Sequence, residues 1–205
     1  MSVIVGHASD LYIQTGSSTA FTTEACSQVA GTTYQITDAA KRQWDEGETV
    51  LVYDDGVLQT SGYKIHGACG RIVFDAAPTT PVTVSGKYYD TAHVAACGGW
   101  KLDLKSGVVK TSGINEVRTF QGTGLLDWGG SFSKLEEDDT YAALVLDNSG
   151  AALVLKMYES KAAPVVWIGY IVPEGWSLDN PDEAGVSESL SFKGTGYLDF
   201  LTSES

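Results

Sequence analysis

Four residues with nitrogen or sulfur side chains have a spacing that a metal site could use. His66 and Cys69 are followed by His93 and Cys97, giving one His-x2-Cys pair and one His-x3-Cys pair. Two imidazoles and two thiolates can hold a tetrahedral zinc ion. The order of the ligands matches no zinc-binding signature, and cysteine is often a small buried hydrophobe. We therefore expect no metal ion and assign no metal-ligating residues.

Acid-base and nucleophilic chemistry have weak candidates. Paired carboxylates occur at Asp54-Asp55 and over residues 136–139, where a turn and a helix start explain them locally. The three histidines do not accompany a Gly-x-Ser-x-Gly nucleophile elbow, so the sequence does not indicate a Ser-His-Asp triad. We expect no catalytic residues, no cofactor and no enzymatic activity.

Two Gly-Thr-Gly segments, at residues 122–124 and 194–196, are the remaining candidates for ligand chemistry. Glycine-rich loops cradle phosphates when a helix follows and supplies a further glycine or a lysine. Neither segment continues in that way. We interpret both as bulges or tight bends in strands, where glycine tolerates crowding or a positive φ.

The chain is rich in aromatic side chains, which could stack on sugars or fill a subunit interface. Ten tyrosines accompany the five tryptophans Trp44, Trp100, Trp128, Trp167 and Trp176. Trp100 belongs to an alternating segment, and Trp128 and Phe200 are equivalent in the repeat described below. We expect most of these side chains to face inward, in core or interface packing.

Charge and length restrict the function further. The 205 residues include 26 acidic and 13 basic ones, and a net charge of -13 repels nucleic acid phosphate. This length suits one domain with a full core, or a core domain that carries a smaller appended lobe. Residues 1–6 lack the basic segment of an export signal, and the sequence has no run of about 18 apolar residues that could span a membrane. We expect folding in the cytoplasm, with Cys26, Cys69 and Cys97 as free thiols.

Short runs of valine, threonine and aromatic residues between glycines predict a mainly β fold. Residues 1–31 have no clear period and are interpreted as an N-terminal arm. Residues 32–90 are predicted to form a β-rich addition or lobe, and residues 91–205 the main core. In the core, a helix is predicted from an N-cap at Asp138 or Asp139 to Asn148, with the acidic residues 136–139 at its positive end. In the lobe, Asp55-Gly56 predicts a hairpin turn.

An internal repeat is the most informative feature of the sequence. Residues 113–128 match residues 185–200 at eight of sixteen positions. Two copies are too few for a solenoid, which needs about three repeats or more. We interpret them as equivalent strands of one sheet system, each interrupted at its Gly-Thr-Gly segment.

The order of motifs after residue 98 resembles the major tail protein family, the tail tube proteins of long, non-contractile-tailed bacteriophages. The resemblance covers about the last half of the chain. Its motifs are Gly-Trp-x-Leu-x-Leu from Gly99, Leu-Leu-Asp-Trp-Gly-Gly-Ser-Phe from Leu125, an acidic helix, apolar strands, and Leu-Ser-Phe-Lys-Gly-Thr-Gly from Leu190.

The resemblance implies a tail-tube-type β-sandwich with one flanking α-helix, and a structural role in the virion tail. Six copies would close a ring, and stacked rings would form the tube that delivers genomic DNA. The implied partners are further copies of the chain and other tail proteins such as terminator, tape measure and distal tail components. DNA would pass without specific binding, and no membrane would take part. Assembly would occur in the host cytoplasm.

The resemblance also implies an acidic lumen, and it places a ring-stacking loop at residues 107–118. An ordinary surface hairpin is the alternative for this segment. Residues 2–16 are a second candidate for contacts between subunits. A carbohydrate-binding β-sandwich module of a phage tail or adhesin also remains open; it would display exposed aromatic side chains on one sheet face.

Overall fold

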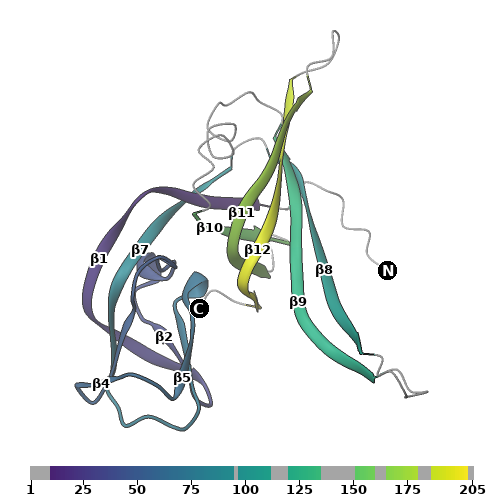
Figure 1. Cartoon of the computed structure of the whole chain (residues 1–205). Helices are drawn as coiled ribbons and strands as arrows, with labels where there is room; N and C mark the ends of the chain where they lie inside the picture. Colours follow the sequence, from purple (N-terminus) through teal and green to yellow (C-terminus); the bar gives the residue numbers. More distant parts are fainter. Residues whose placement is uncertain are drawn as a thin grey trace.

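The chain was analysed as a computed structural model, which describes residues 10–94, 97–111, 120–134, 151–159, 165–179 and 186–202. Within these residues the protein is almost entirely β-structure, as predicted, with two short 3-10 turns (Figure 1). The elements are β1 (Asp10–Ala30), β2 (Thr33–Ile36), η1 (Ala39–Lys41), β3 (Leu51–Asp54), β4 (Val57–Gln59), β5 (Tyr63–His66), η2 (Gly67–Cys69), β6 (Arg71–Phe74), β7 (Val82–His93), β8 (Cys97–Thr111), β9 (Phe120–Lys134), β10 (Leu153–Tyr158), β11 (Val166–Asp179) and β12 (Ser187–Leu201).

The strands form one continuous antiparallel network. Its main path runs β4-β3-β7-β1-β10-β11-β12-β9-β8, with β2, β5 and β6 joined to it through β1. The flanking helix predicted to end near residue 148 lies outside the described residues, and the described part of the chain contains no α-helix. It also contains no helix long and apolar enough to cross a membrane.

Most of the predicted N-terminal arm is a strand. From Asp10 onward it is β1, the longest strand of the described chain, which pairs first with β10, then with β7 and finally with β2. Most of its second half is exposed, so the serine- and threonine-rich sequence shows no clear apolar period. Its partner β7 lies far away in sequence, and a local pattern cannot reveal that pairing.

The second half of β1 closes with β2–β7 into a lobe, here defined as residues 19–90 (Figure 1). Its core is an apolar cluster around Trp44, Phe21 and Ile72. The predicted hairpin is confirmed: Asp55 and Gly56, both with positive φ, connect β3 to β4. A second cluster in the main core includes residues of β1, β9, β10, β11 and β12.

The three cysteines are free thiols. Burial raises the pKa of Cys26 to about 12 from an ordinary value near 9. Burial, together with the nearby Asp199 carboxylate, also raises the pKa of Cys69. Unfolding exposes both thiols and returns them to ordinary acidity.

Stability is therefore expected to fall at alkaline pH. The thiols lose their protons near pH 9 in the unfolded chain but keep them in the folded protein. Their contribution to the stability of the folded state is therefore complete below pH 9 and is lost as the pH rises toward about 12. The slope is up to about 1.4 kcal/mol per pH unit for each thiol. Urea unfolding in reductant between pH 8 and pH 10, on the parent and a Cys26→Ala variant, measures it. A parent stability that stays constant over this range would contradict the expectation.

Candidate functional site

The four residues considered for metal binding lie in two separate places. His66 Nδ1 donates to Asp199 Oδ1 at 2.7 Å, and Cys69 Sγ donates to Asp199 Oδ2 at 3.4 Å. His93 instead pairs with Asp10, and Cys97 Sγ donates to a backbone carbonyl. The described ranges contain no group of three or more ligating side chains arranged for a metal ion.

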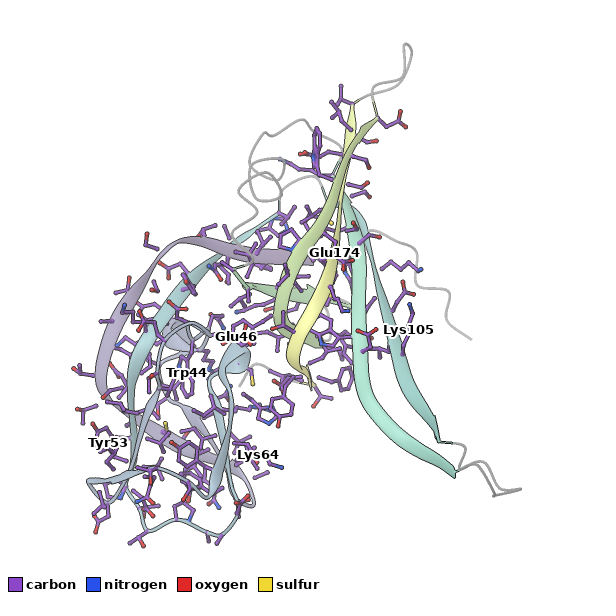
Figure 2. The ribbon with its side chains drawn as sticks, in the orientation of Figure 1. Trp44, Glu46, Tyr53, Lys64, Lys105 and Glu174 are labelled. Carbon is purple, nitrogen blue, oxygen red and sulfur yellow. The ribbon has the colours of Figure 1, made fainter. Side chains whose placement is uncertain are left out.

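The His66 and Asp199 pair belongs to a junction between the lobe and β12. A cavity of about 330 Å³ lies there, and Figure 2 shows Glu46 at this junction. Thr195 Oγ1 donates to the Glu46 carboxylate, and Tyr170 Oη donates to the backbone oxygen of Trp44 at 2.7 Å. These bonds cross from the lobe to the main core, so the junction holds the two parts together.

Removing the Asp199 carboxylate should weaken this junction. Asp199→Ala leaves the imidazole of His66 without its acceptor and the thiol of Cys69 with the backbone oxygen of His66 as acceptor, and the expected loss of stability is about 1–3 kcal/mol. His93→Gln is the control, because it removes an exposed pair that contributes less than about 1 kcal/mol. Urea unfolding measures the midpoints of the parent and of both variants. Equal midpoints for the two variants would show that the junction contributes nothing specific.

Both Gly-Thr-Gly segments coincide with bulges. In β9, Thr123 pairs with Val108 and Leu126 with Ser106, so β9 carries one extra residue between these pairs. In β12 the equivalent pairs use Thr195 and Leu198. The bulge interpretation is therefore confirmed for both copies.

The two glycines of the second copy are required for different structural reasons. A Cβ on Gly194 would lie 1.9 Å from Trp128 Cε2, because the indole ring covers that backbone. Gly196 has φ +61°, and an added Cβ there would lie 3.5 Å from Glu46 Oε1, an ordinary contact distance. Trp128 Nε1 donates to the carbonyl oxygen of Gly196 at 3.5 Å. Trp128 belongs to the first copy of the repeat, so each copy supplies part of one packing arrangement.

The repeat produces a duplicated hairpin. The copies lie on β9 and β12, which pair with each other, while β8 and β11 are their respective hairpin partners. The resulting order β8-β9-β12-β11 is here called the four-stranded unit. Its two hairpins point in opposite directions (Figure 1). β8 and β11 are thus equivalent outer strands.

One face of the four-stranded unit is polar. Figure 2 shows Lys105 and Glu174 on its β8 and β11 sides, and a groove of about 450 Å³ lies over the face. The charged residues lining the groove are equal in number: Lys101, Lys105 and Lys193 against Asp103, Asp127 and Glu174. Serines, glycines, Trp128 and Phe192 make up the rest of the lining. The acidic lumen implied by the family resemblance stays a prediction.

The opposite face is apolar and partly buried. Trp100, Phe132, Leu190 and Trp176 occupy one row across the four strands. Phe132 and Leu190, in the middle of the row, are buried against β1 and β10. Trp176 is 37% exposed, and its Nε1 donates to the buried carboxylate of Glu188 at 3.0 Å. The row therefore has a tryptophan at each outer strand.

The outer strands have open edges. Among the described residues, β8 pairs only with β9, and β11 beyond Ile171 pairs only with β12. Exposed apolar side chains occur on both strands: Leu104 of β8 is 47% exposed, and Leu178 of β11 is 41% exposed. Pro173 lies in this open part of β11, as expected for an edge strand or a bulge.

The β8–β9 hairpin continues beyond the four-stranded unit. Pairing of β9 with β12 ends at Gly129, whereas pairing with β8 extends to Phe120. The part formed by residues 105–111 and 120–127, here called the arm, is therefore a two-stranded ribbon (Figure 1). Two-stranded ribbons are only marginally stable alone, so this geometry favours docking on a partner.

The aromatic residues were predicted to face inward, and this holds for part of the set. Trp44 and Trp128 are buried. Phe200, expected inward as the equivalent of Trp128, is 48% exposed and packs against Trp167, with the ring centroids 4.5 Å apart and the rings tilted. The burial of Trp128 and Phe200 differs because β9 continues past Trp128, whereas β12 ends at Leu201, one residue after Phe200. Sequence reasoning also missed the edge role of Trp176 and Leu178, whose alternation with Gly175, Ser177 and Asp179 was the available signal.

These features define an antiparallel β protein whose duplicated hairpin leaves two open edges. No protein-family model and no curated protein matches the chain. Among solved structures, the tail of an empty GTA particle with C6 symmetry resembles it with a TM-score of 0.43 and 12% identity, over 55% of this chain and 87% of that chain. The 6-fold symmetrised baseplate of the anti-feeding prophage resembles it with a TM-score of 0.40 and 13% identity, over 55% of this chain and 84% of that chain. Similarity at this level does not establish a shared fold.

Proposed function

We propose that this protein is a structural subunit of a bacteriophage virion, the tail tube protein of a long, non-contractile tail. Its copies form hexameric rings that stack into the tube through which genomic DNA is delivered. The observation that carries the proposal is the four-stranded unit, with a polar face, a partly buried apolar face and an open edge on each side. The motif order from Gly99 to Gly196 supports the same role.

Strand direction favours ring formation. The four strands alternate in direction, so β8 and β11 run antiparallel to each other. When β8 of one copy meets β11 of the next, the combined sheet is therefore antiparallel throughout. Such a contact joins two different surfaces, which generates a ring when the rotation closes. Closure also removes the exposed edges, which would otherwise promote aggregation.

The size of the channel favours six copies over three. Four strands from each of six copies make about 24 strands, and a spacing of about 4.8 Å gives a backbone diameter of at least about 37 Å. Side chains narrow this to roughly 25 Å, enough for duplex DNA, whose width is about 20 Å. Three copies would give only about 18 Å between backbones, too narrow for a duplex.

Assembly of the purified protein tests the proposal. We expect negative-stain images at rising protein concentration to show rings and tubes with a central channel, and light scattering to show a matching increase in mass. Tail initiation components should lower the concentration required. A protein that stays monomeric at every concentration, also with these components, would contradict the proposal.

A carbohydrate-binding module is the second candidate. Tyr197 is 52% exposed, stacks on His66 at 4.3 Å and lines the junction cavity, and Phe200 is exposed on the same strand. Exposed aromatic rings of this kind can stack on sugars. Binding of the monomer to a glycan array that is lost in Tyr197→Ala would favour this candidate. The tail tube proposal predicts no such binding.

A further inference from the structure

The cavity at the junction between the lobe and β12 has the form of a small-molecule site. Its volume is about 330 Å³, and apolar atoms make up most of its lining. Small-molecule sites are typically cavities of about 300–1,000 Å³ with apolar and aromatic walls and a few polar groups. The lobe supplies Val50, Ile65 and Ala68 to the walls, and the strands β11 and β12 supply Tyr170 and Tyr197. A ligand in this cavity therefore contacts both parts of the molecule.

The charged groups in the walls of the cavity are carboxylates. Its lining contains neither lysine nor arginine, and the acidic residues in it are Asp45, Glu46, Glu48 and Asp199. Two of these carboxylates have a basic partner: Lys87 pairs with Glu48 at 2.5 Å, and His66 donates to Asp199 at 2.7 Å. The other two carboxylates decide the charge that a ligand meets.

The carboxylates of Glu46 and Asp45 have neutral partners. Both oxygens of Glu46 lie 3.1 Å from the hydroxyl of Thr195. Asp45 accepts from the backbone N–H of Gly47 at 3.0 Å, and among the described residues no lysine, arginine or histidine forms an ion pair with either carboxylate. Burial raises the pKa of the Tyr170 hydroxyl, and the charges of Glu46 and Asp45 raise it further. Their negative potential therefore extends into the cavity.

An aromatic ring lies beside the Glu46 carboxylate. A Cβ on Gly196 would lie 3.5 Å from Glu46 Oε1, so the carboxylate lies next to the backbone that leads to Tyr197. Tyr197 is exposed, and its ring stacks on His66. A cation near a tyrosine ring is attracted by the ring quadrupole. A neutral sugar can also stack on this ring, but it gains nothing from the negative potential, so the cavity favours a cation.

We propose that the junction cavity binds a small organic ammonium ion with an apolar body. The apolar body packs between the wall of the lobe and the wall formed by β11 and β12. The ammonium group lies near the Glu46 carboxylate and the Tyr197 ring. This binding site is separate from the four-stranded unit, so a single copy of the chain contains all of it.

Titration calorimetry with three probes of similar shape tests the class of ligand. The probes are phenethylamine as its ammonium ion, the neutral phenethyl alcohol and the anion phenylacetate, each at neutral pH and low salt. The ammonium ion should bind about tenfold more tightly than the alcohol, and phenylacetate more weakly than both. Added salt should weaken binding of the ammonium ion through screening. Because the ligand bridges the lobe and the main core, it should also raise the melting temperature.

Glu46→Gln tests the position of the charge. The amide keeps an oxygen that can accept from Thr195 but loses the negative charge, so the affinity for the ammonium ion should fall about three- to tenfold while that for the alcohol stays the same. Asp75→Asn is the matched control. Asp75 is exposed, lies beyond the end of β6 that is away from His66, and does not line the cavity. Melting curves establish that both variants are folded.

Three outcomes would overturn the inference. Equal affinity of the parent for the ammonium ion and the alcohol would show an apolar cavity without selection for charge. An equal loss of affinity in Glu46→Gln and Asp75→Asn would show general attraction to a chain with a net charge of -13. A folded parent that binds none of the probes would show that the cavity takes no such ligand. Ring formation by the parent, seen in negative-stain images, is measured separately, so each of these results leaves the proposed function standing.

Discussion

Replacing Gly194 by valine is expected to destabilise the fold strongly. An added Cβ would lie 1.9 Å from Cε2 and 2.0 Å from Cδ2 of Trp128, far inside van der Waals contact. The ring cannot move away easily, because it also covers Gly169, where a Cβ would lie 2.7 Å from it. Overpacking typically costs 1–3 kcal/mol and sometimes more, and we expect about 3 kcal/mol or more here. This is a large part of a total stability of roughly 5–15 kcal/mol.

Thermal and urea melts of Gly194→Val and Gly194→Ala measure the effect. A Trp128→Leu background provides the control: the smaller side chain opens space over Gly194, so Gly194→Ala should cost less there than in the parent. This non-additivity is the signature of direct contact. Equal costs in both backgrounds would show that Trp128 is not the cause.

Substitutions at Gly196 test the effect of backbone conformation separately from the effect of crowding. It has φ +61°, and an added Cβ would lie 3.5 Å from Glu46 Oε1, an ordinary contact distance, so Gly196→Val should cost about 1–3 kcal/mol mainly through backbone strain, and Gly196→Asn less, since asparagine tolerates the left-handed region. Gly124 has the equivalent place in the β9 bulge, and we expect a similar cost for Gly124→Val. A phosphate-binding loop would instead keep its fold and lose a ligand. Variants at residues 194 and 196 that both melt like the parent would contradict the structural interpretation.

Deleting residues 110–115 is expected to abolish tubes while leaving the subunit folded. The deletion removes the end of the β8 part of the arm, which pairs only with β9 among the described residues. Its loss should change the melting temperature little, because hairpin ends make few buried contacts and loop length has a weak effect on closure entropy. Negative-stain images should show separate rings in place of stacked ones.

A variant with residues 110–115 replaced by glycine and serine is the matched control, since it keeps the length of the segment. If side chains of the arm dock on the next ring, this variant should also fail to stack. Normal tubes from the deletion would refute the assignment of residues 107–118 to ring stacking, and would favour an ordinary surface hairpin.

Local signals in the sequence predicted local structure well. Asp55-Gly56 produced the hairpin turn between β3 and β4, because these residues tolerate positive φ. The alternation of residues 100–105 is typical of a half-buried strand, and this segment is part of β8. The repeat predicted equivalent strands with bulges at Gly-Thr-Gly, and the pairing of β9 and β12 confirms that reading.

Contacts between distant segments could not be predicted in the same way. Residues 10–30 of the predicted N-terminal arm form β1. The partners of β1, strands β7 and β10, follow much later in the chain, so the local sequence could not indicate this pairing. His66 and Cys69 suggested a metal site with His93 and Cys97, but they hydrogen-bond to Asp199, more than 100 residues away. Spacing in sequence contains no information about such a partner.

The sequence by itself determined the β class, the acidic net charge, the duplicated strand and the positions of its bulges, because each depends on residue type or on neighbours along the chain. Only the tertiary structure decided which strands are outermost, which face of the four-stranded unit is polar and what covers Gly194. These depend on the order in which strands pair. That order is set by burial of apolar faces contributed by segments far apart in sequence, such as Leu11 of β1 and Met157 of β10 against Phe192 of β12.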